Sequence, residues 1–232
     1  MRITSPVRTL EGRSGFGSRF VETSIARRAR LHAGHANATF PGMKVIGLAG
    51  RAGSGKSAVG RALAQRPGVA FVDLDRVAWS TYQIGAPTYW RLVSCFGRGI
   101  LRPDGAVDRL RLAEAAFGSA RSREELDAIV HPAVIGRLRD LILEEEARGT
   151  GVLLVEGALL GSSPHVDRSL FTTILWLEAS DRARRERLEA CGRGGHAVRE
   201  FAEPDCGAVR RVSAEGTPQD VADRIARLID TL

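Results

Sequence analysis

The stretch Gly50-Arg-Ala-Gly-Ser-Gly-Lys-Ser57 decides the fold of this 232-residue chain. Its spacing is that of the GxxxxGK[ST] phosphate loop, in which successive backbone N–H groups converge on phosphate oxygens. An apolar run at residues 44–49 predicts a buried strand before the loop, and the residues from 57 to about 65 predict a helix after it. We therefore expect nucleotide phosphates to be bound by the whole loop, namely Gly50, Arg51, Ala52, Gly53, Ser54, Gly55, Lys56 and Ser57.

Lys56 and Ser57 have distinct expected roles in the loop. A compact lysine ammonium suits the β- and γ-phosphates of a nucleotide better than a planar guanidinium does. Of the 34 basic residues of the chain, only Lys44 and Lys56 are lysines, and the others are arginines. The Ser57 hydroxyl is the expected ligand of Mg²⁺. A nucleotide bound together with Mg²⁺ is therefore the predicted ligand of the loop, and an accidental glycine-rich turn is the alternative.

Residues 70–73 predict a second strand, and the stretch 71–75 ends in two carboxylates, Asp73 and Asp75. Open α/β sheets bind their substrates at the carboxyl ends of the strands. Phosphoryl transfer uses a carboxylate there to orient or deprotonate the attacking hydroxyl. Asp75 is the candidate catalytic residue and Asp73 a candidate substrate or metal contact. The alternative is that one or both only cap the following helix.

The rest of the chain alternates further strands with helices. Residues 151–155, 171–177 and 208–212 read as strands, and Thr217 with Pro218 marks the start of a closing helix. This pattern predicts an α/β fold of the P-loop NTPase type, a parallel sheet with helices on both faces. Residues 76–149 read as a helical insertion whose helices break at Gly85, at 97–105 and at Pro132.

Composition separates an N-terminal tail from the body of the protein. Residues 1–42 carry seven arginines against two acidic residues, so the remainder holds only a small part of the net charge of +7. The body lacks the basic footprint of a nucleic-acid-binding protein. We expect 1–42 to be a disordered extension, a targeting peptide or a consequence of a start placed upstream of Met43. The kinase-like domain is then 43–232.

Hydropathy and cysteine content exclude other classes. No apolar run approaches the roughly 20 residues that span a bilayer, so no membrane association is expected. Three cysteines without metal-ligand spacing argue against a disulfide framework or a zinc site and favour a reducing compartment. A cytoplasmic location follows as the expectation, and the sequence does not indicate an oligomeric state.

Several segments now show a resemblance to a known family. Residues 46–57 followed by Val72-Asp-Leu-Asp75 resemble the opening of dephospho-CoA kinases, and so do Asp108-Arg109-Leu110 and the segment 126–134 with its His131-Pro132 pair. The resemblance runs from about residue 43 to 188. It implies phosphorylation of the 3′-hydroxyl of dephospho-CoA by MgATP, with Asp75 as the catalytic aspartate and 76–149 as the substrate domain.

The resemblance also supplies candidate substrate contacts and a lid. Asp73, Arg109 and His131 become substrate-binding candidates, although His131 before a proline equally suits a helix start. The lid is expected at about 180–206. It contains five arginines suited to binding phosphoryl oxygens: Arg182, Arg184, Arg185, Arg187 and Arg193. Arg187 is the catalytic candidate among them. The alternative is that these arginines only form a solvated basic helix.

The chain departs from the family pattern at Arg51, usually glycine, at Trp79, usually arginine, and across 207–216. Glu156, at the end of the strand 151–155, is expected either to steer Mg²⁺ or to hold the following loop. Two alternative functions remain open. One is a kinase for another small metabolite, such as a nucleotide or sugar, and the other is an ATP-binding family member with impaired catalysis.

Overall fold

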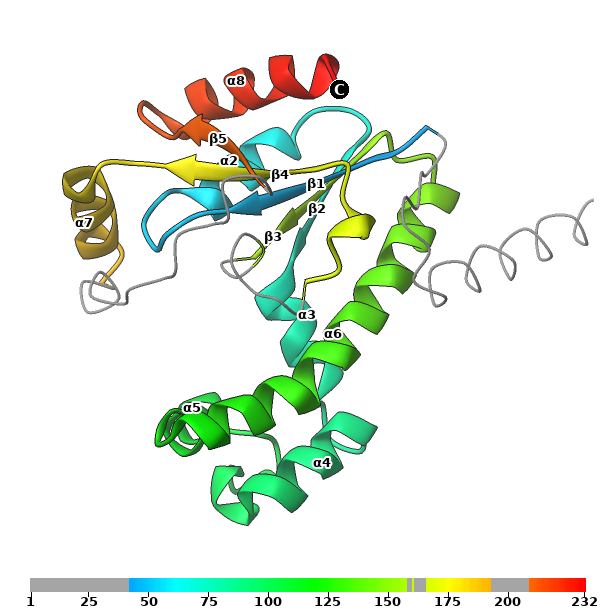
Figure 1. Cartoon of the computed structure of the whole chain (residues 1–232), viewed down its shortest axis with the longest axis vertical. Coiled ribbons are helices and arrows are strands. Elements are labelled where there is room, and N and C mark those ends of the chain that lie inside the picture. The colour runs from blue at the N-terminus through cyan, green and yellow to red at the C-terminus, as the bar shows by residue number, and fades with distance from the viewer. Residues whose placement is uncertain (1–41, 158–159, 161–165, 193–208) are drawn as a thin grey trace, which may run out of the picture. The chain divides into compact units, whose positions relative to one another are not determined.

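A computed structural model describes residues 42–157, 160, 166–192 and 209–232. Five parallel strands form its sheet in the order β2-β3-β1-β4-β5. Figure 1 shows the sheet between helices. The strands are β1 (Lys44–Ala49), β2 (Val69–Asp73), β3 (Val152–Glu156), β4 (Thr173–Glu178) and β5 (Arg210–Ser213).

Helices α2 (Lys56–Leu63) and α8 (Pro218–Asp230) pack together on one face of the sheet. Ile46 and Leu48 of β1 are fully buried in the core cluster that these helices form with the strands. Alternate residues of a strand point to the same face, so this spacing follows from the strand itself. Thr217 caps α8 in a capping box, as the sequence predicts.

The segment between β2 and β3 is helical throughout most of its length. It contains α3 (Leu74–Thr81), α4 (Pro87–Phe96), the short 3₁₀ helix η1 (Arg98–Ile100), α5 (Arg109–Phe117) and α6 (Ala120–Ala147). Figure 1 shows α4 and α5 beside the first half of α6. These helices bury a cluster of their own, which includes Tyr82, Tyr89 and Leu92. The insertion therefore has its own core in addition to the one on the sheet.

The expected break at Pro132 is wrong, because α6 continues through this proline. Proline lacks the N–H that would bond the carbonyl of Ala128, four residues earlier. Arg91 of α4 supplies a substitute, since its Nη2 donates to the Ala128 oxygen over 3.5 Å. The reading of His131 as a helix-start residue is wrong for the same reason, because it lies within α6.

The chain returns to the sheet through η2 (Arg168–Leu170) and β4, after which α7 (Asp181–Ala190) precedes β5. The predicted α/β class with a parallel sheet is confirmed, and each expected strand is present. The expectations for 1–41 and for the lid beyond residue 192 fall outside the described residues. Within the described part of the chain, no helix is both long and apolar enough to cross a membrane.

Candidate active site

The phosphate loop turns sharply between β1 and α2. Gly50 and Gly53 have φ angles of +145° and +77°, and Gly55, with φ +94°, occupies the position before the first helical residue. These angles lie in the region that glycine adopts without steric cost. The Ser54 N–H donates to the Arg51 carbonyl over 3.1 Å and closes the turn. The loop thus leads directly into the N-terminus of α2, whose dipole favours an anion.

Lys56 is buried at the base of this loop and folds back over it. Its Nζ donates to the carbonyl oxygens of Gly50, at 2.9 Å, and Arg51, at 3.1 Å. Burial lowers the pKa of the ammonium, whereas the negative charges of Glu156 and Asp75 raise it. The loop therefore holds one cation close to two carboxylates.

Strand pairing explains why these carboxylates lie near the loop. Glu156 of β3 is in register with Leu48 of β1 on one side and with Asp73 of β2 on the other. The carboxyl ends of the three strands are therefore neighbours at one edge of the sheet. This is the edge at which open α/β sheets bind ligands.

Glu156 is joined to the phosphate loop through Ser57. The Ser57 hydroxyl donates to Glu156 Oε1 over 2.7 Å, and Glu156 Oε2 is buried without a hydrogen-bond partner among the described residues. Burial raises the pKa of this carboxyl group, while the Ser57 hydrogen bond and Lys56 lower it.

A serine hydroxyl beside a carboxylate with an unused oxygen fits Mg²⁺. This ion prefers oxygen ligands and keeps several waters, so one or two protein oxygens suffice. Among the described residues no cluster of three or more histidine, cysteine or acidic side chains could hold a metal ion. Ser57 and Glu156 together offer two oxygens that could hold such an ion.

Asp73 and Asp75 have different surroundings. Asp73 caps α3, since its Oδ1 accepts from the backbone N–H groups of Asp75 and Arg76 at 2.9 and 3.3 Å. Asp75 reaches solvent, but partial desolvation by the protein around it raises its pKa, and the charge of Asp73 adds to this while Lys56 opposes it. The capping alternative therefore applies to Asp73, whereas the Asp75 carboxylate is exposed and interacts electrostatically with Lys56.

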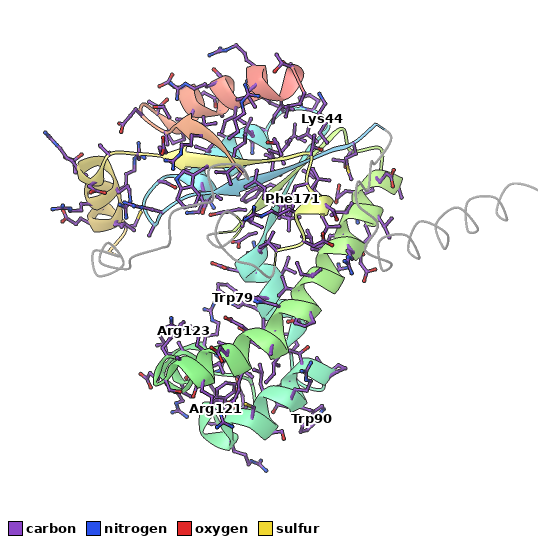
Figure 2. All side chains as sticks on the ribbon, in the orientation of Figure 1. Lys44, Trp79, Trp90, Arg121, Arg123 and Phe171 are labelled. Carbon is purple, nitrogen blue, oxygen red and sulfur yellow. The ribbon has the colours of Figure 1, made fainter. Side chains whose placement is uncertain are left out.

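Trp79 and Arg109 form a second pair close to Asp75. The Arg109 guanidinium carbon lies 3.6 Å from the centroid of the Trp79 ring. Trp79 is 39% exposed, and Figure 2 labels it on α3. Burial raises the pKa of the neighbouring Tyr82 to about 12, with Arg109 lowering it and Asp75 raising it. Sequence reasoning missed Tyr82, because its interactions with Arg109 and Asp75 depend on how α3 and α5 are placed.

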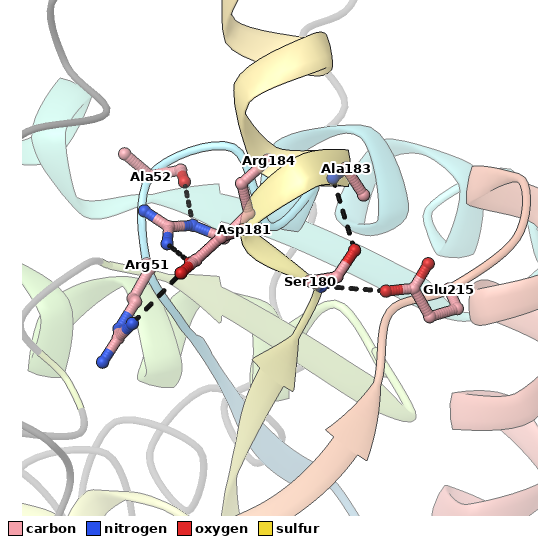
Figure 3. Close-up of polar contacts among 7 residues, drawn as sticks. All are labelled: Arg51, Ala52, Ser180, Asp181, Ala183, Arg184 and Glu215. Atoms are coloured by element: carbon pink, nitrogen blue, oxygen red, sulfur yellow. Dashed lines mark hydrogen bonds and ion pairs between the residues drawn. The ribbon is translucent and has the colours of Figure 1, made fainter.

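Helix α7 places two arginines against the phosphate loop. Arg187 Nη1 donates to the Ser54 carbonyl at 3.4 Å and its Nη2 to the Ala214 carbonyl at 3.0 Å, so it joins the loop to the segment after β5. Arg184 is buried and bonds the Ala52 carbonyl (Figure 3). Sequence reasoning favoured Arg187 alone, although the shared helix face of residues 184 and 187 pointed to both.

Two further candidate residues, His131 and Arg51, have contacts that do not define a role toward substrate. His131 lies within α6, where its Nε2 is 3.7 Å from the Asp127 carboxylate. Arg51, at the unusual second position of the loop, lies 4.0 Å from Asp181 of α7. Their roles toward substrate remain predictions.

Comparison with known proteins now identifies the family. The sequence profile described as dephospho-CoA kinase matches residues 44–190, more than half of the chain. The chain belongs to the dephospho-CoA kinase family. The resemblance predicted from the sequence is therefore confirmed.

Individual members of the dephospho-CoA kinase family agree with this assignment. The dephospho-CoA kinase of Symbiobacterium thermophilum is 31% identical over 188 residues, covering 81% of this chain and 74% of that protein. The dephospho-CoA kinase of Geobacter sulfurreducens is 38% identical over 144 residues, covering 62% and 72%.

Solved structures show the same fold. The crystal structure of TT1252 from Thermus thermophilus has a TM-score of 0.64 and 26% identity, covering 82% of this chain and 98% of that one. The dephospho-CoA kinase from Campylobacter jejuni, with a TM-score of 0.50 and 14% identity, covers 82% and 97%. This second likeness concerns the fold alone.

Proposed function

We propose that this chain transfers the γ-phosphoryl group of ATP to the 3′-hydroxyl of dephospho-CoA, the last step in making coenzyme A. The grouping of Lys56, Asp75 and Glu156 around the phosphate loop supports this most strongly. It combines a grip for a nucleotide with a carboxylate for an alcohol, in a member of the dephospho-CoA kinase family.

The nucleotide is held first. Backbone N–H groups of the loop and the N-terminus of α2 receive the phosphate oxygens. The Lys56 ammonium exchanges the carbonyls of Gly50 and Arg51 for the β- and γ-phosphates, because an anion binds a cation more strongly than a neutral carbonyl does. Arg187, which donates to the Ser54 carbonyl, adds positive charge beside the loop.

Ser57 and Glu156 would hold Mg²⁺ in this complex. When bound, the ion neutralises charge on the phosphate oxygens. The Ser57 hydroxyl oxygen and the Glu156 carboxylate would be the protein groups that hold the ion.

Asp75 receives the proton of the 3′-hydroxyl. As the new oxygen–phosphorus bond forms and the bond to ADP breaks, the proton moves to the Asp75 carboxylate and later to solvent. The raised pKa brings this base closer to neutral pH, where a proton acceptor works best.

The acceptor is expected to lie beside Arg109. Dephospho-CoA carries a diphosphate and an adenine ring, which suit a guanidinium and an aromatic face respectively. Arg109 and Trp79 lie together near Asp75 and offer both groups.

A substrate panel tests this function. Purified protein is incubated with MgATP and, separately, dephospho-CoA, AMP and a hydroxylated sugar, and products are identified by mass. We expect coenzyme A with one ADP per turnover, and no product with the other acceptors. Product from AMP or the sugar alone would indicate a different kinase. ATP binding by calorimetry without any transfer would indicate an impaired family member.

A further inference from the structure

Arg184 joins helix α7 to the phosphate loop from a buried position. It is 7% exposed, whereas Arg182 and Arg185 of the same helix are exposed. Its Nε donates to the Ala52 carbonyl over 2.8 Å and its Nη1 to the Asp181 carboxylate over 2.6 Å (Figure 3). Burying a guanidinium is unfavourable unless it is paired, so these two contacts fix the side chain in place.

The contact with Ala52 also sets the direction of the next N–H. In a planar trans peptide the carbonyl of one residue and the N–H of the following residue point in opposite directions. Because the Ala52 carbonyl points toward Arg184, the Gly53 N–H points away from α7. That is the side on which a phosphate enclosed by the loop would lie.

The backbone of α7 approaches the loop as closely as the side chain does. A Cβ built on Gly53 would lie 2.6 Å from the Arg184 carbonyl oxygen, so no larger residue fits there. Arg51 adds a second link, with its Nη1 4.0 Å from the Asp181 carboxylate that Arg184 also contacts (Figure 3). The first turn of α7 therefore packs directly against the phosphate loop.

We propose that Arg184 is a positioning residue for nucleotide binding. It holds the Ala52 carbonyl outward and thereby directs the Gly53 N–H at the phosphates of ATP. The inference rests on the proposed use of this loop as a phosphate site. It assigns to α7 a role in shaping the loop before any nucleotide arrives.

Inorganic tripolyphosphate is the probe, because it tests phosphate binding without adenine and without an acceptor. Its dissociation constant is measured by calorimetry for wild type, Arg184→Met, Arg184→Gln and the control Arg227→Met, which replaces an exposed arginine of α8. Methionine keeps the length of the side chain but has no donor. We expect about 10-fold weaker binding for Arg184→Met. Arg184→Gln, which retains an N–H donor, should recover part of the loss, and Arg227→Met should stay within about twofold of wild type.

Steady-state kinetics separate positioning from a general loss of structure. Arg184→Met should raise KM for ATP and leave KM for dephospho-CoA unchanged, whereas a merely unfolded fraction would lower kcat alone. Wild-type tripolyphosphate affinity in Arg184→Met would overturn the proposal. So would an equal loss in Arg184→Gln and Arg184→Met.

A crystal structure of the wild-type protein with tripolyphosphate decides the matter if Arg184→Met does not fold. A Gly53 N–H bonded to a phosphate oxygen, with Arg184 still on the Ala52 carbonyl, supports the proposal. A Gly53 N–H turned away from the phosphates overturns it. Tripolyphosphate binding by a protein that does not phosphorylate dephospho-CoA would refute only the proposed acceptor.

Discussion

Asp75 combines a raised pKa with a position beside the cation of the phosphate loop. A proton acceptor works only when it is ionised, so turnover should fall as pH decreases through this raised pKa. The acidic limb of the kcat/KM profile should therefore lie above 3.8, the ordinary value for aspartate. Initial rates across pH, with a stability check at each pH, measure it. A profile that stays flat down to the ordinary value would remove Asp75 from the role of base.

The same carboxylate should also cost stability. When the folded-state pKa of an acid is raised, its protonated form is favoured by folding, so the ionised form destabilises the protein at neutral pH. Asp75→Asn should therefore raise Tm at pH 7.5.

Asp73→Ala should lower stability by about 1 kcal/mol, because it removes the cap of α3. Thermal melts of both variants check this pair, and a lower Tm for Asp75→Asn would contradict it.

Arg109 should act on the acceptor and not on ATP. Its replacement by alanine removes a charged donor, and we expect KM for dephospho-CoA to rise about 10-fold while KM for ATP is unchanged. Trp79→Ala should show the same split, and Trp79→Phe a smaller one, because phenylalanine keeps a ring beneath the guanidinium. Arg121→Ala, also on the helical insertion, is the control. Equal changes in both KM values would indicate a structural effect.

Residue types and spacing in the sequence were enough to name Lys56, Ser57 and Asp75 as candidates, and their roles stay predictions. The buried contact of Arg184 with the phosphate loop and the surroundings of Tyr82 were not predictable in the same way. Their importance depends on a carbonyl 132 residues away along the chain for Arg184, and for Tyr82 on charges brought close by α3 and α5. Local patterns carry no record of such contacts.

At the scale of elements, α6 shows how a distant side chain overrides a local rule. Proline within a helix leaves one carbonyl without its donor, and Arg91 of α4 reaches the Ala128 oxygen that Pro132 leaves open. Arg91→Met should therefore destabilise the protein by about 1 kcal/mol. In a Pro132→Ala background the same change should be nearly neutral, because the introduced alanine provides the missing N–H.

A double-mutant cycle by chemical denaturation tests this coupling. Additive effects of Arg91→Met and Pro132→Ala would contradict the idea that the Arg91 side chain replaces the backbone N–H missing at Pro132. The expected break at Pro132 was wrong for this reason: the proline signal was correct locally, but the compensating contact comes from another helix. By contrast, the cap of α8 lies entirely within a few residues, and it could be predicted.

For the whole molecule, the sequence predicted the strands and their parallel arrangement but not their order. Strand order depends on pairing between distant segments, and it places β3 between β1 and β2. This order positions Glu156 between the loop and Asp73, and so completes the charge arrangement of the site.

Nucleotide binding should stabilise the whole fold through this arrangement. ATP at 100 times its dissociation constant adds about 2.7 kcal/mol to folding, which corresponds to a rise in Tm of roughly 5–10 °C for a protein of this size. Lys56→Met should lose most of the rise, because the phosphates lose their buried cation. Differential scanning fluorimetry with and without MgATP measures it, and an undiminished shift in Lys56→Met would show that ATP binds elsewhere.

The most direct measurement compares wild type with Asp75→Asn in a single turnover of saturating MgATP and dephospho-CoA, alongside ATP affinity by calorimetry. We predict that wild type forms coenzyme A, and that the asparagine variant binds ATP with similar affinity but forms product at least about 100-fold more slowly. A comparable rate in the variant would contradict the claim that the Asp75 carboxylate accepts the proton of the attacking 3′-hydroxyl.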